Sequence, residues 1–485
     1  MNVNAEILMN VTPTETRVGV VENGVLQEIF IERANHRGIV GNIYKGKIVR
    51  VLPGMQAAFV DIGLERAAFI HAAEIGEGDA NAPINQLVHE GQSLVVQVTK
   101  DPIGTKGARL TTQLSIPSRY LVFMPGSVHV GISQKIEENA ERDRLKQLVK
   151  DSMEAEGLTG EAGFILRTAA EGVGEEEIGA DTSYLRRLWR KLEERIADNK
   201  PPSLVYDELP LSLRTIRDLS RPETNKILID SRETHQKIEQ FCQQYVPEVA
   251  EKIDYYPGPR PIFELYSVED EIQRALERKV PLKSGGYLVI DQTEAMTTID
   301  VNTGGFVGRR NLEETIFKTN LEAATAIGRQ VRLRNLGGII ILDFIDMTDT
   351  EHQRQVLRML EKVLEKDHTK TKISGVSELG LVEMTRKRTR ESLEHMLMES
   401  CNACDGRGVV KTAETICYEI FREILREERA YEAGTYLVLA SQPVVDRLLD
   451  EDSHGLADLE AFIGKAIKLQ VEAQYTQDQY DIVLQ

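Results

Sequence analysis

The chain has few of the features of a secreted or membrane-spanning protein. Its 485 residues include only four cysteines, too few for a disulfide framework, which indicates a reducing compartment. The first residues show no basic segment followed by an apolar one, and no apolar run approaches the ~20 residues that span a bilayer. We therefore expect a cytoplasmic protein without a transmembrane segment.

Positive charge is scarce as well. Lys and Arg number 59 against 77 Asp and Glu, a formal net charge of −18. Such an acidic chain is unsuited to binding anions over its whole surface, so any nucleic-acid site must be a local basic groove. The sequence also lacks a Walker loop, a GxSxG elbow and an HExxH motif, which excludes the hydrolases that depend on them.

What is present indicates a globular α/β protein of several domains. At ~150 residues per domain the length predicts about three domains or more. Short, evenly spaced strands with glycine punctuation between residues 38 and 120 describe a small closed barrel. Charged helical segments follow, residues 376–398 are also expected to be helical, and a final αβ module begins near residue 412.

The most informative pattern is a pair of acidic strand ends. Residues 297–305 and 337–346 are apolar, β-branched runs that turn polar, and they carry the carboxylates Asp300 and Asp343. Period-two geometry points Asp300 and Asn302 to one face. The helical pattern between the runs implies a parallel crossover with both acidic ends at one sheet edge. Two carboxylates and an amide can hold Mg²⁺ and leave positions for water and a phosphate, which indicates phosphodiester chemistry.

The same residues also have a structural interpretation. Asp and Asn are common where strands end, and Gly304 and Gly305 follow the first run, so turn chemistry alone could explain them. Asp346, three residues beyond Asp343, is expected to face elsewhere in a supporting or structural role. Glu294 is expected to be a solvated turn residue.

Aromatic and basic side chains are interleaved along the barrel. They are Phe59, Phe69, Tyr44, Lys45, Lys47, Arg50, His71 and Lys106. This combination suits single-stranded RNA, because bases stack on rings while cations follow the backbone. The alternative is that Phe59 and Phe69 belong to the core, as aromatic residues commonly do.

Two further segments could contact phosphate. Arg167 and Thr168 end a predicted strand and enter a turn, where a guanidinium, a hydroxyl and an amide can hold a terminal phosphate, although a surface arginine at a strand end is commoner. Residues 386–390 are the densest basic cluster. On a helix, Arg386 and Arg390 would share a face, either solvated or along a phosphate path.

Cys401 and Cys404 form a CxxC pair followed by glycines, which is half of a zinc knuckle. A structural zinc needs four ligands, and only Cys242 and Cys417 remain. Either those two complete the site, or two chains each give two thiolates, which predicts a zinc-linked homodimer. A buried or redox-idle pair without metal is the alternative.

In the order of its motifs the chain resembles the ribonuclease E/G family along essentially its whole length. The motifs that carry the resemblance are NIYKGK at 42–47, AAFVD at 57–61, RT at 167–168, TIDVNTG at 298–304, GLVEMTR at 380–386, and the cysteine pair. The chain ends soon after its small last module, so it resembles the shorter members that lack a long disordered tail.

The resemblance implies an α/β multidomain architecture. Its parts are an RNase H-like domain with an inserted S1-type OB barrel, a 5′-sensor domain, a DNase I-like catalytic domain, a zinc link and a small C-terminal αβ domain. The expected boundaries are 1–37 and 213–280 for the RNase H-like domain, 38–120 for the barrel, 121–212 for the sensor, 281–398 for the catalytic domain, 399–411 for the zinc link and 412–485 for the last domain.

The resemblance also implies a Mg²⁺-dependent, single-strand-specific endoribonuclease. Such an enzyme is stimulated by a 5′-monophosphate, leaves 3′-hydroxyl and 5′-phosphate ends, and acts on rRNA precursors and mRNA. The implied site residues are Asp300 and Asp343 as Mg²⁺ ligands, Asn302 as the positioning amide, Arg167 and Thr168 as the 5′-phosphate sensor, Phe59, Phe69 and Lys106 as the RNA-gripping face, and Cys401 and Cys404 as ligands of a Zn²⁺ shared between two chains of a homodimer or tetramer.

The chain departs from the family pattern at two places. Asn402 stands where members often carry proline, and residues 132–135 contain less arginine than the family leads us to expect, so no RNA contact is assigned there. The rival function is a non-catalytic RNA-binding or ribosome-assembly factor built on the barrel. Metal-dependent turnover separates the two.

Overall fold

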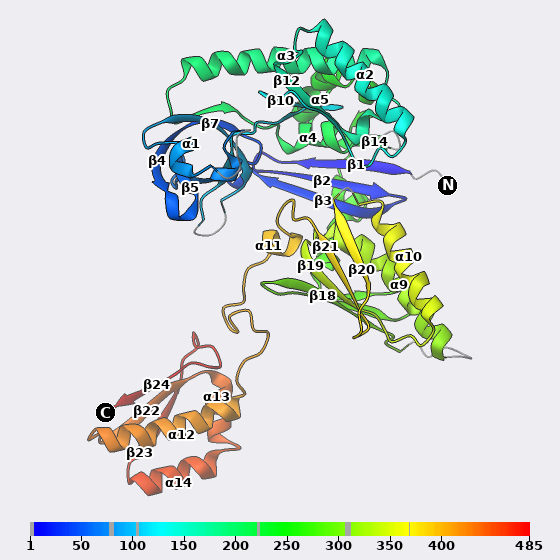
Figure 1. Cartoon of the computed structure of the whole chain (residues 1–485). Coiled ribbons are helices and arrows are strands. Elements are labelled where there is room, and N and C mark those ends of the chain that lie inside the picture. Colours follow the sequence, from blue (N-terminus) through cyan, green and yellow to red (C-terminus); the bar gives the residue numbers. More distant parts are fainter. Residues whose placement is uncertain (1–3, 77–81, 103–105, 221–223, 306–311, 368) are drawn as a thin grey trace. The chain divides into compact units, whose positions relative to one another are not determined.

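The computed structural model describes residues 4–76, 82–102, 106–220, 224–305, 312–367 and 369–485. The chain divides into two compact units, residues 1–393 and 394–485, each of which is described by itself. The described part of the larger unit contains four sheets and that of the smaller unit one (Figure 1). Within these ranges no helix has the length and apolar character needed to cross a membrane.

The first sheet joins two parts of the chain that are far apart in sequence. Its order is β15-β14-β1-β2-β3, and β1 and β14 pair in parallel. The strands are β1 (Ala5–Val11), β2 (Glu15–Glu22), β3 (Val25–Arg33), β14 (Thr224–Ile229) and β15 (Ile253–Tyr255). The helices of this region are α4 (Leu211–Asp218), α5 (Arg232–Tyr245), α6 (Pro247–Ala250), α7 (Ile262–Leu265) and α8 (Val268–Leu276).

A small barrel follows β3 in the chain. Its strands are β4 (Ile43–Leu52), β5 (Ala57–Asp61), β6 (Ala68–His71), β7 (Ser93–Lys100) and β8 (Arg109–Thr111), with α1 (Ile84–Leu87) between β6 and β7. The pairing of β4 with β7 closes the barrel, and β13 (Ser203–Tyr206) adds to the start of β4. Alternate residues of β5 and β6 point inward, so Ala58, Val60 and Ile70 are buried in its core.

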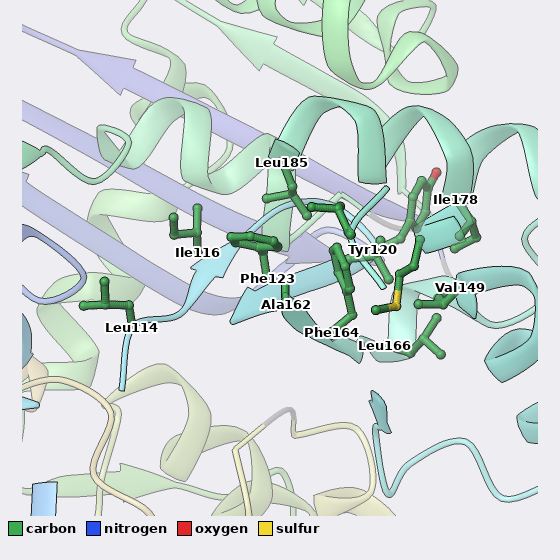
Figure 2. Close-up of a cluster of buried hydrophobic side chains, with 14 of the residues drawn as sticks. Leu114, Ile116, Tyr120, Phe123, Val149, Ala162, Phe164, Leu166, Ile178 and Leu185 are labelled. Carbon is green, nitrogen blue, oxygen red and sulfur yellow. The ribbon is translucent and has the colours of Figure 1, made fainter. Parts of the chain in front are cut away.

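The third sheet is covered by two long, charged helices. Its order is β11-β12-β10-β9. The elements are β9 (Ile116–Pro117), β10 (Leu121–Pro125), β11 (Val130–Ile132), β12 (Ala162–Leu166), α2 (Asn139–Ala155) and α3 (Glu175–Asp198). Figure 2 shows side chains of the sheet and helices meeting in one core, where the rings of Phe123 and Phe164 lie edge to face with centroids 5.3 Å apart. This core contains Leu166, the last residue of β12, and so fixes the position of Arg167, which follows it directly.

The fourth sheet contains both acidic strands. Its order is β16-β17-β18-β19-β21-β20. The strands are β16 (Lys279–Pro281), β17 (Tyr287–Gln292), β18 (Met296–Asn302), β19 (Gly338–Asp343), β20 (Thr371–Val376) and β21 (Leu381–Arg386). Helices α9 (Leu312–Leu333) and α10 (Thr350–Leu364) pack on one face, with their apolar residues in the same core as Ile299 and Leu342 (Figure 1). As the strand-helix-strand pattern predicts, β18 and β19 are parallel.

The helix expected over residues 376–398 is wrong. This segment contains β21 and only the short helix α11 (Leu393–Leu397). Val382 and Met384 are buried while Glu383 and Thr385 are exposed, which is the period-two alternation of a strand. The charged residues obscured this alternation, and pairing with β19 and β20 fixes the segment as a strand.

The smaller unit has a three-stranded sheet with order β23-β22-β24. Its elements are α12 (Ala413–Ala430), β22 (Thr435–Ala440), α13 (Gln442–Leu449), α14 (Ser453–Ile463), β23 (Ala466–Val471) and β24 (Tyr480–Leu484). β22 pairs in parallel with β23 and antiparallel with β24. Buried residues of α12, β22 and α13 form its core, and the fully buried Tyr436 is one of them.

Candidate active site

Asp300 and Asp343 occupy matching positions on neighbouring strands. They are register partners in the parallel pair β18–β19, and both side chains are exposed. Their neighbours Ile299 and Leu342 point the other way, into the core beneath the helices. Asn302 lies two residues beyond Asp300 on the same face, and its Nδ2 donates to Asp300 Oδ2 at 2.7 Å. The structure thus brings the three residues to one face of the sheet.

The backbone around this group is held by close packing. A side chain at Gly286 would place its Cβ 2.6 Å from the carbonyl oxygen of Asn302, so only glycine lets β17 approach the end of β18 here. Gly304 adopts φ +58°, in the left-handed region, which turns the chain directly after Asn302. Glycine is therefore required on both sides of the candidate site.

Sequence reasoning missed Asn320, which is fully buried on α9. Its amide forms two hydrogen bonds with the backbone of Ile345. Nδ2 donates to the carbonyl oxygen at 2.8 Å, and Oδ1 accepts from the N–H at 3.1 Å. These bonds hold the segment that follows Asp343. The signal in the sequence is an asparagine on the apolar face of a helix, where a buried amide needs partners.

Acidic charge accumulates at the strand ends. Partial burial and the charges of Asp300 and Asp346 raise the pKa of Asp343 above its usual value. Asp346 is exposed, and its negative charge contributes to the raised pKa of Asp343. Like charges held together without a neutralising cation are suited to receiving one.

The donors fit a magnesium ion better than a metal held by protein alone. Among the described residues, no group of three His, Cys, Asp or Glu side chains could hold a metal ion. The site therefore offers two carboxylates and an amide. Mg²⁺ typically takes one or two carboxylates and keeps its other positions for water and substrate phosphates. The residues present fit that ion.

Phe59 and Phe69 lie on the outer face of the barrel. They are register partners on β5 and β6, with ring centroids 6.0 Å apart at an interplanar angle of 68°. Both rings are half-buried, whereas their strand neighbours Val60 and Ile70 fill the core. The core interpretation of these two rings is therefore wrong, because strand alternation turns them outward.

Basic side chains flank the two rings. Arg50 is the register partner of Phe59, and Arg109 that of Phe69. Lys106 is exposed just before β8, and a Cβ at the next residue, Gly107, would lie 2.2 Å from the carbonyl oxygen of Ala67, so the backbone here passes close to the start of β6. The two rings, Arg50 and Arg109 thus share one outer surface of the barrel.

Two other barrel candidates make contacts within the protein. Tyr44 is 6% exposed and belongs to the barrel core, because it lies on the same side of β4 as Ile48. The ammonium of Lys45 donates to the carbonyl oxygen of Ile196 at 2.6 Å. The expected contact of Tyr44 with a ligand is wrong, because strand alternation places its ring in the core. The ammonium of Lys45 is held by α3 instead of standing free on the barrel surface.

Arg167 and Thr168 are adjacent at the end of β12, and both have protein partners. Arg167 Nη1 donates to the carbonyl oxygen of Ser118 at 2.5 Å, and Nη2 forms an ion pair with Asp218 at 2.7 Å. Although burial opposes the change, Arg217 and Arg167 hold the pKa of Asp218 below its usual value. The exposed Thr168 shares a hydrogen bond with Ser133 at 2.9 Å. A phosphate here would meet an arginine whose direction is already fixed.

The basic cluster at residues 386–390 does not form a phosphate path on a helix. Arg386 is 5% exposed, and its Nε bonds Asp367 Oδ2 at 2.6 Å. Arg390 lies over the ring of Phe30, 4.0 Å from its centroid, and burial lowers its pKa to about 10. Arg386 is thus buried at the end of β21 in the fourth sheet, and Arg390 packs on β3 of the first sheet. Sequence alone could not distinguish these positions from a solvated face.

Cys401 and Cys404 lie in a tight turn at the start of the smaller unit. Backbone N–H groups of Cys404 and Ala403, then the Cys404 side chain, lower the pKa of the Cys401 thiol, which favours the thiolate that binds metals. The N–H of Gly408 donates to Cys404 Sγ at 3.3 Å. The turn thus presents two sulfurs suited to Zn²⁺.

The other two cysteines are not presented to a ligand. Cys242 lies in the core around β1 and β14, and Cys417 in the core of the smaller unit. Both are fully buried, and burial raises the pKa of Cys417 to about 11. This burial argues against a site completed by Cys242 and Cys417.

Comparisons with known proteins agree with this arrangement. Residues 115–389 match the ribonuclease E/G family, residues 39–110 the S1 RNA binding domain, and residues 400–485 the thioredoxin-like domain of RNase E/G. The chain is 57% identical to ribonuclease G of Escherichia coli (strain K12) and 54% identical to that of Haemophilus influenzae, over 99% of each chain. It is 38% identical to ribonuclease E of Escherichia coli (strain K12) over 90% of this chain and 42% of that protein.

Proposed function

The chain belongs to the ribonuclease E/G family and is an endoribonuclease, and we propose that Asp300, Asn302 and Asp343 form its Mg²⁺-dependent active site. The observation that carries the proposal is the meeting of two carboxylates on one exposed sheet face beside an amide. Hard oxygen ligands with open positions are what a phosphodiester needs for metal-assisted hydrolysis.

The roles of the three residues follow from their placement. Asp300 and Asp343 would hold Mg²⁺, which when bound stabilises charge on the scissile phosphate and lowers the pKa of a water molecule. Asn302 is fixed by its bond to Asp300, so its remaining N–H can position a phosphate oxygen. In-line attack by water breaks the bond to the 3′-oxygen, which takes up a proton. The products are a 3′-hydroxyl and a 5′-phosphate.

Two more surfaces account for the form of RNA that is cut. We propose that Phe59, Phe69 and Lys106 grip unpaired RNA, because bases within a duplex are unavailable for stacking. Arg167 and Thr168 would bind a 5′-monophosphate, with the guanidinium exchanging Asp218 for the phosphate. Holding the 5′ end positions the strand and increases the rate of cleavage.

The remaining proposals concern assembly and role. Two chains would share one Zn²⁺ through Cys401 and Cys404, which gives a homodimer, with the tetramer as the larger alternative. None of the four cysteines, all of which lie in the described ranges, forms a disulfide bond, which is consistent with a reducing cytoplasm. The substrates would be rRNA precursors, cut during 5′-end maturation, and mRNAs, cut during decay.

One assay tests the active site and the sensor together. A short A/U-rich single-stranded RNA with a 5′-monophosphate or a 5′-hydroxyl is incubated with Mg²⁺ or with EDTA. We expect cleavage only with Mg²⁺ and faster on the monophosphate. Arg167→Ala should remove the preference for the monophosphate and leave cleavage of the 5′-hydroxyl RNA unchanged. Equal rates on both RNAs with the unsubstituted enzyme would refute the sensor, and cutting in EDTA would refute the metal site.

A further inference from the structure

Tyr287 lies beside the candidate active site on the neighbouring strand. It is the register partner of Asn302 in the antiparallel pair β17–β18. Paired residues of antiparallel strands point to the same face, with Cβ atoms about 4.5–5.5 Å apart. The ring is half-buried and its neighbour Leu288 is fully buried beneath the sheet, so the ring belongs to the face that carries Asp300. An aromatic surface therefore adjoins the amide that would position the phosphate.

A lysine lies over this ring. The ammonium of Lys279, on the edge strand β16, is 3.6 Å from the ring centroid of Tyr287. Lys279 is exposed, and within the described residues no carboxylate forms an ion pair with it. The preceding residue differs, because Arg278 forms an ion pair with Asp291 at 2.5 Å. The charge of Lys279 thus remains available to an anion, in an otherwise acidic neighbourhood.

The position of the ring is fixed by the backbone. A Cβ at Gly304 would lie 2.5 Å from the carbonyl oxygen of Gly285 and 3.5 Å from Cδ1 of Tyr287. The two glycine turns therefore meet beside the ring, at the same end of the strands as Asn302. An aromatic side chain so placed can order a ligand without a large entropic cost.

We propose that Tyr287 and Lys279 form a nucleotide subsite next to the scissile phosphate, an inference that rests on the proposed function of Asp300, Asn302 and Asp343. The base of one nucleotide flanking the cut stacks on Tyr287. The ammonium of Lys279, on its flexible stem, leaves the ring for the backbone phosphate of that nucleotide. Stacking accepts any base, so this subsite sets the geometry of the strand rather than its sequence.

RNA is the ligand favoured by these observations. A π-face, a cation without a carboxylate partner and a phosphate-binding group occur side by side, which is the combination used to bind single strands. The structural alternative is that Lys279 and Tyr287 form a cross-strand packing pair that only stabilises the edge of the sheet. The two differ in whether the effect of removing the ring depends on the base at the cut.

The test uses the full-length enzyme with Mg²⁺ and a 5′-monophosphorylated RNA cut at one position. Matched RNAs carry an abasic nucleotide immediately upstream or downstream of the cut. Tyr287→Ala should lower kcat/KM on the intact RNA about 10-fold or more, since stacking contributes ~1–3 kcal/mol per base. Tyr287→Phe, which keeps the ring, should cleave like the unsubstituted enzyme.

The abasic RNAs give the decisive comparison. At one of the two flanking positions, loss of the base should slow the unsubstituted enzyme by a similar factor and should not slow Tyr287→Ala further. If the two effects multiply at both positions, or if Tyr287→Ala cleaves normally, the subsite is refuted. The proposed function fails separately, through absence of Mg²⁺-dependent cleavage by the unsubstituted enzyme.

Lysine variants keep the proposal testable if Tyr287→Ala folds poorly. Lys279→Ala should raise KM several-fold with kcat unchanged, and should reduce the slope of log kcat/KM against log salt concentration by about one. Lys372→Ala is the matched control, because Lys372 is an exposed lysine on β20, at the opposite edge of the same sheet. Identical salt slopes for the unsubstituted enzyme and both lysine variants would overturn the role of Lys279.

Discussion

Asp300 and Asp343 are direct neighbours across the parallel pair β18–β19, at the point where both strands leave the core. The helix α9 between them makes this possible, because a parallel crossover returns the chain to the same edge of the sheet. Partial burial, followed by the negative charges of Asp300 and Asp346, raises the pKa of Asp343. The geometry is costly for the protein alone and favourable once a cation is bound.

Replacement of one carboxylate should separate catalysis from folding. Asp343→Asn should lower cleavage with Mg²⁺ about 1000-fold, since several kcal/mol of transition-state stabilisation is lost. In EDTA its melting temperature should equal or exceed that of the unsubstituted protein, because one of two like charges is removed. Added Mg²⁺ should raise the melting temperature of the unsubstituted protein only. Unfolding of the variant would instead assign Asp343 a structural role.

The outward rings of the barrel should act on RNA affinity rather than on folding. Phe59→Ala or Phe69→Ala should weaken binding of single-stranded RNA about 10-fold, because each stacked base contributes ~1–3 kcal/mol. Binding is measured by fluorescence anisotropy with Mg²⁺ replaced by EDTA. Ile70→Ala is the control, because this fully buried neighbour should cost about 2–5 kcal/mol of stability. Unchanged affinity in both Phe variants would contradict the RNA-gripping face.

The sequence predicts the meeting of the candidate active-site residues better than it predicts their surroundings. Asp300, Asn302 and Asp343 follow from strand periodicity and from the parallel crossover, both of which are local or nearly local rules. Sequence alone does not predict whether the ring of Phe59 points into or out of the barrel, because both sides of its strand carry apolar residues. Closure of the barrel places Val60 in the core and therefore turns the ring of Phe59 outward.

Long-range pairing explains what could not be predicted. Arg386 looks like a solvated charge in sequence, yet its partner Asp367 lies on a different segment and both are buried. Asn320 looks like a neutral helix residue until Ile345 is brought against it. Tyr287 is recognised as a neighbour of the candidate site only through its pairing with Asn302 across β17 and β18. In each case the informative contact joins residues distant in sequence.

The buried pair of Arg386 and Asp367 should control stability and its pH dependence. Asp367→Asn should reduce the free energy of unfolding by about 3–5 kcal/mol, because it leaves a buried guanidinium without its counterion. Although burial opposes the change, Arg386 holds the pKa of Asp367 below its usual value. A lowered folded pKa stabilises the protein above the unfolded pKa of about 4, and this stabilisation is lost as pH falls below it.

Urea unfolding at several pH values between about 3 and 7 measures this effect. The difference in stability between the unsubstituted protein and Asp367→Asn should shrink as pH falls. Asp291→Asn is the control, because Asp291 and Arg278 are both exposed and should contribute little. A difference that stays constant with pH would show that folding does not shift the pKa of Asp367, which would contradict this role of the ion pair.

The cysteine turn should determine both zinc content and assembly. With a shared site, the protein should bind one Zn²⁺ per two chains and sediment as a dimer or larger. Cys404→Ser removes a thiolate and should lower zinc content and dissociate the assembly, at protein concentrations where the unsubstituted protein stays associated. Cys417→Ala should keep both, because Cys417 is buried in the core of the smaller unit and cannot reach a surface site. One Zn²⁺ per chain, lost in Cys417→Ala, would instead place all ligands within one chain.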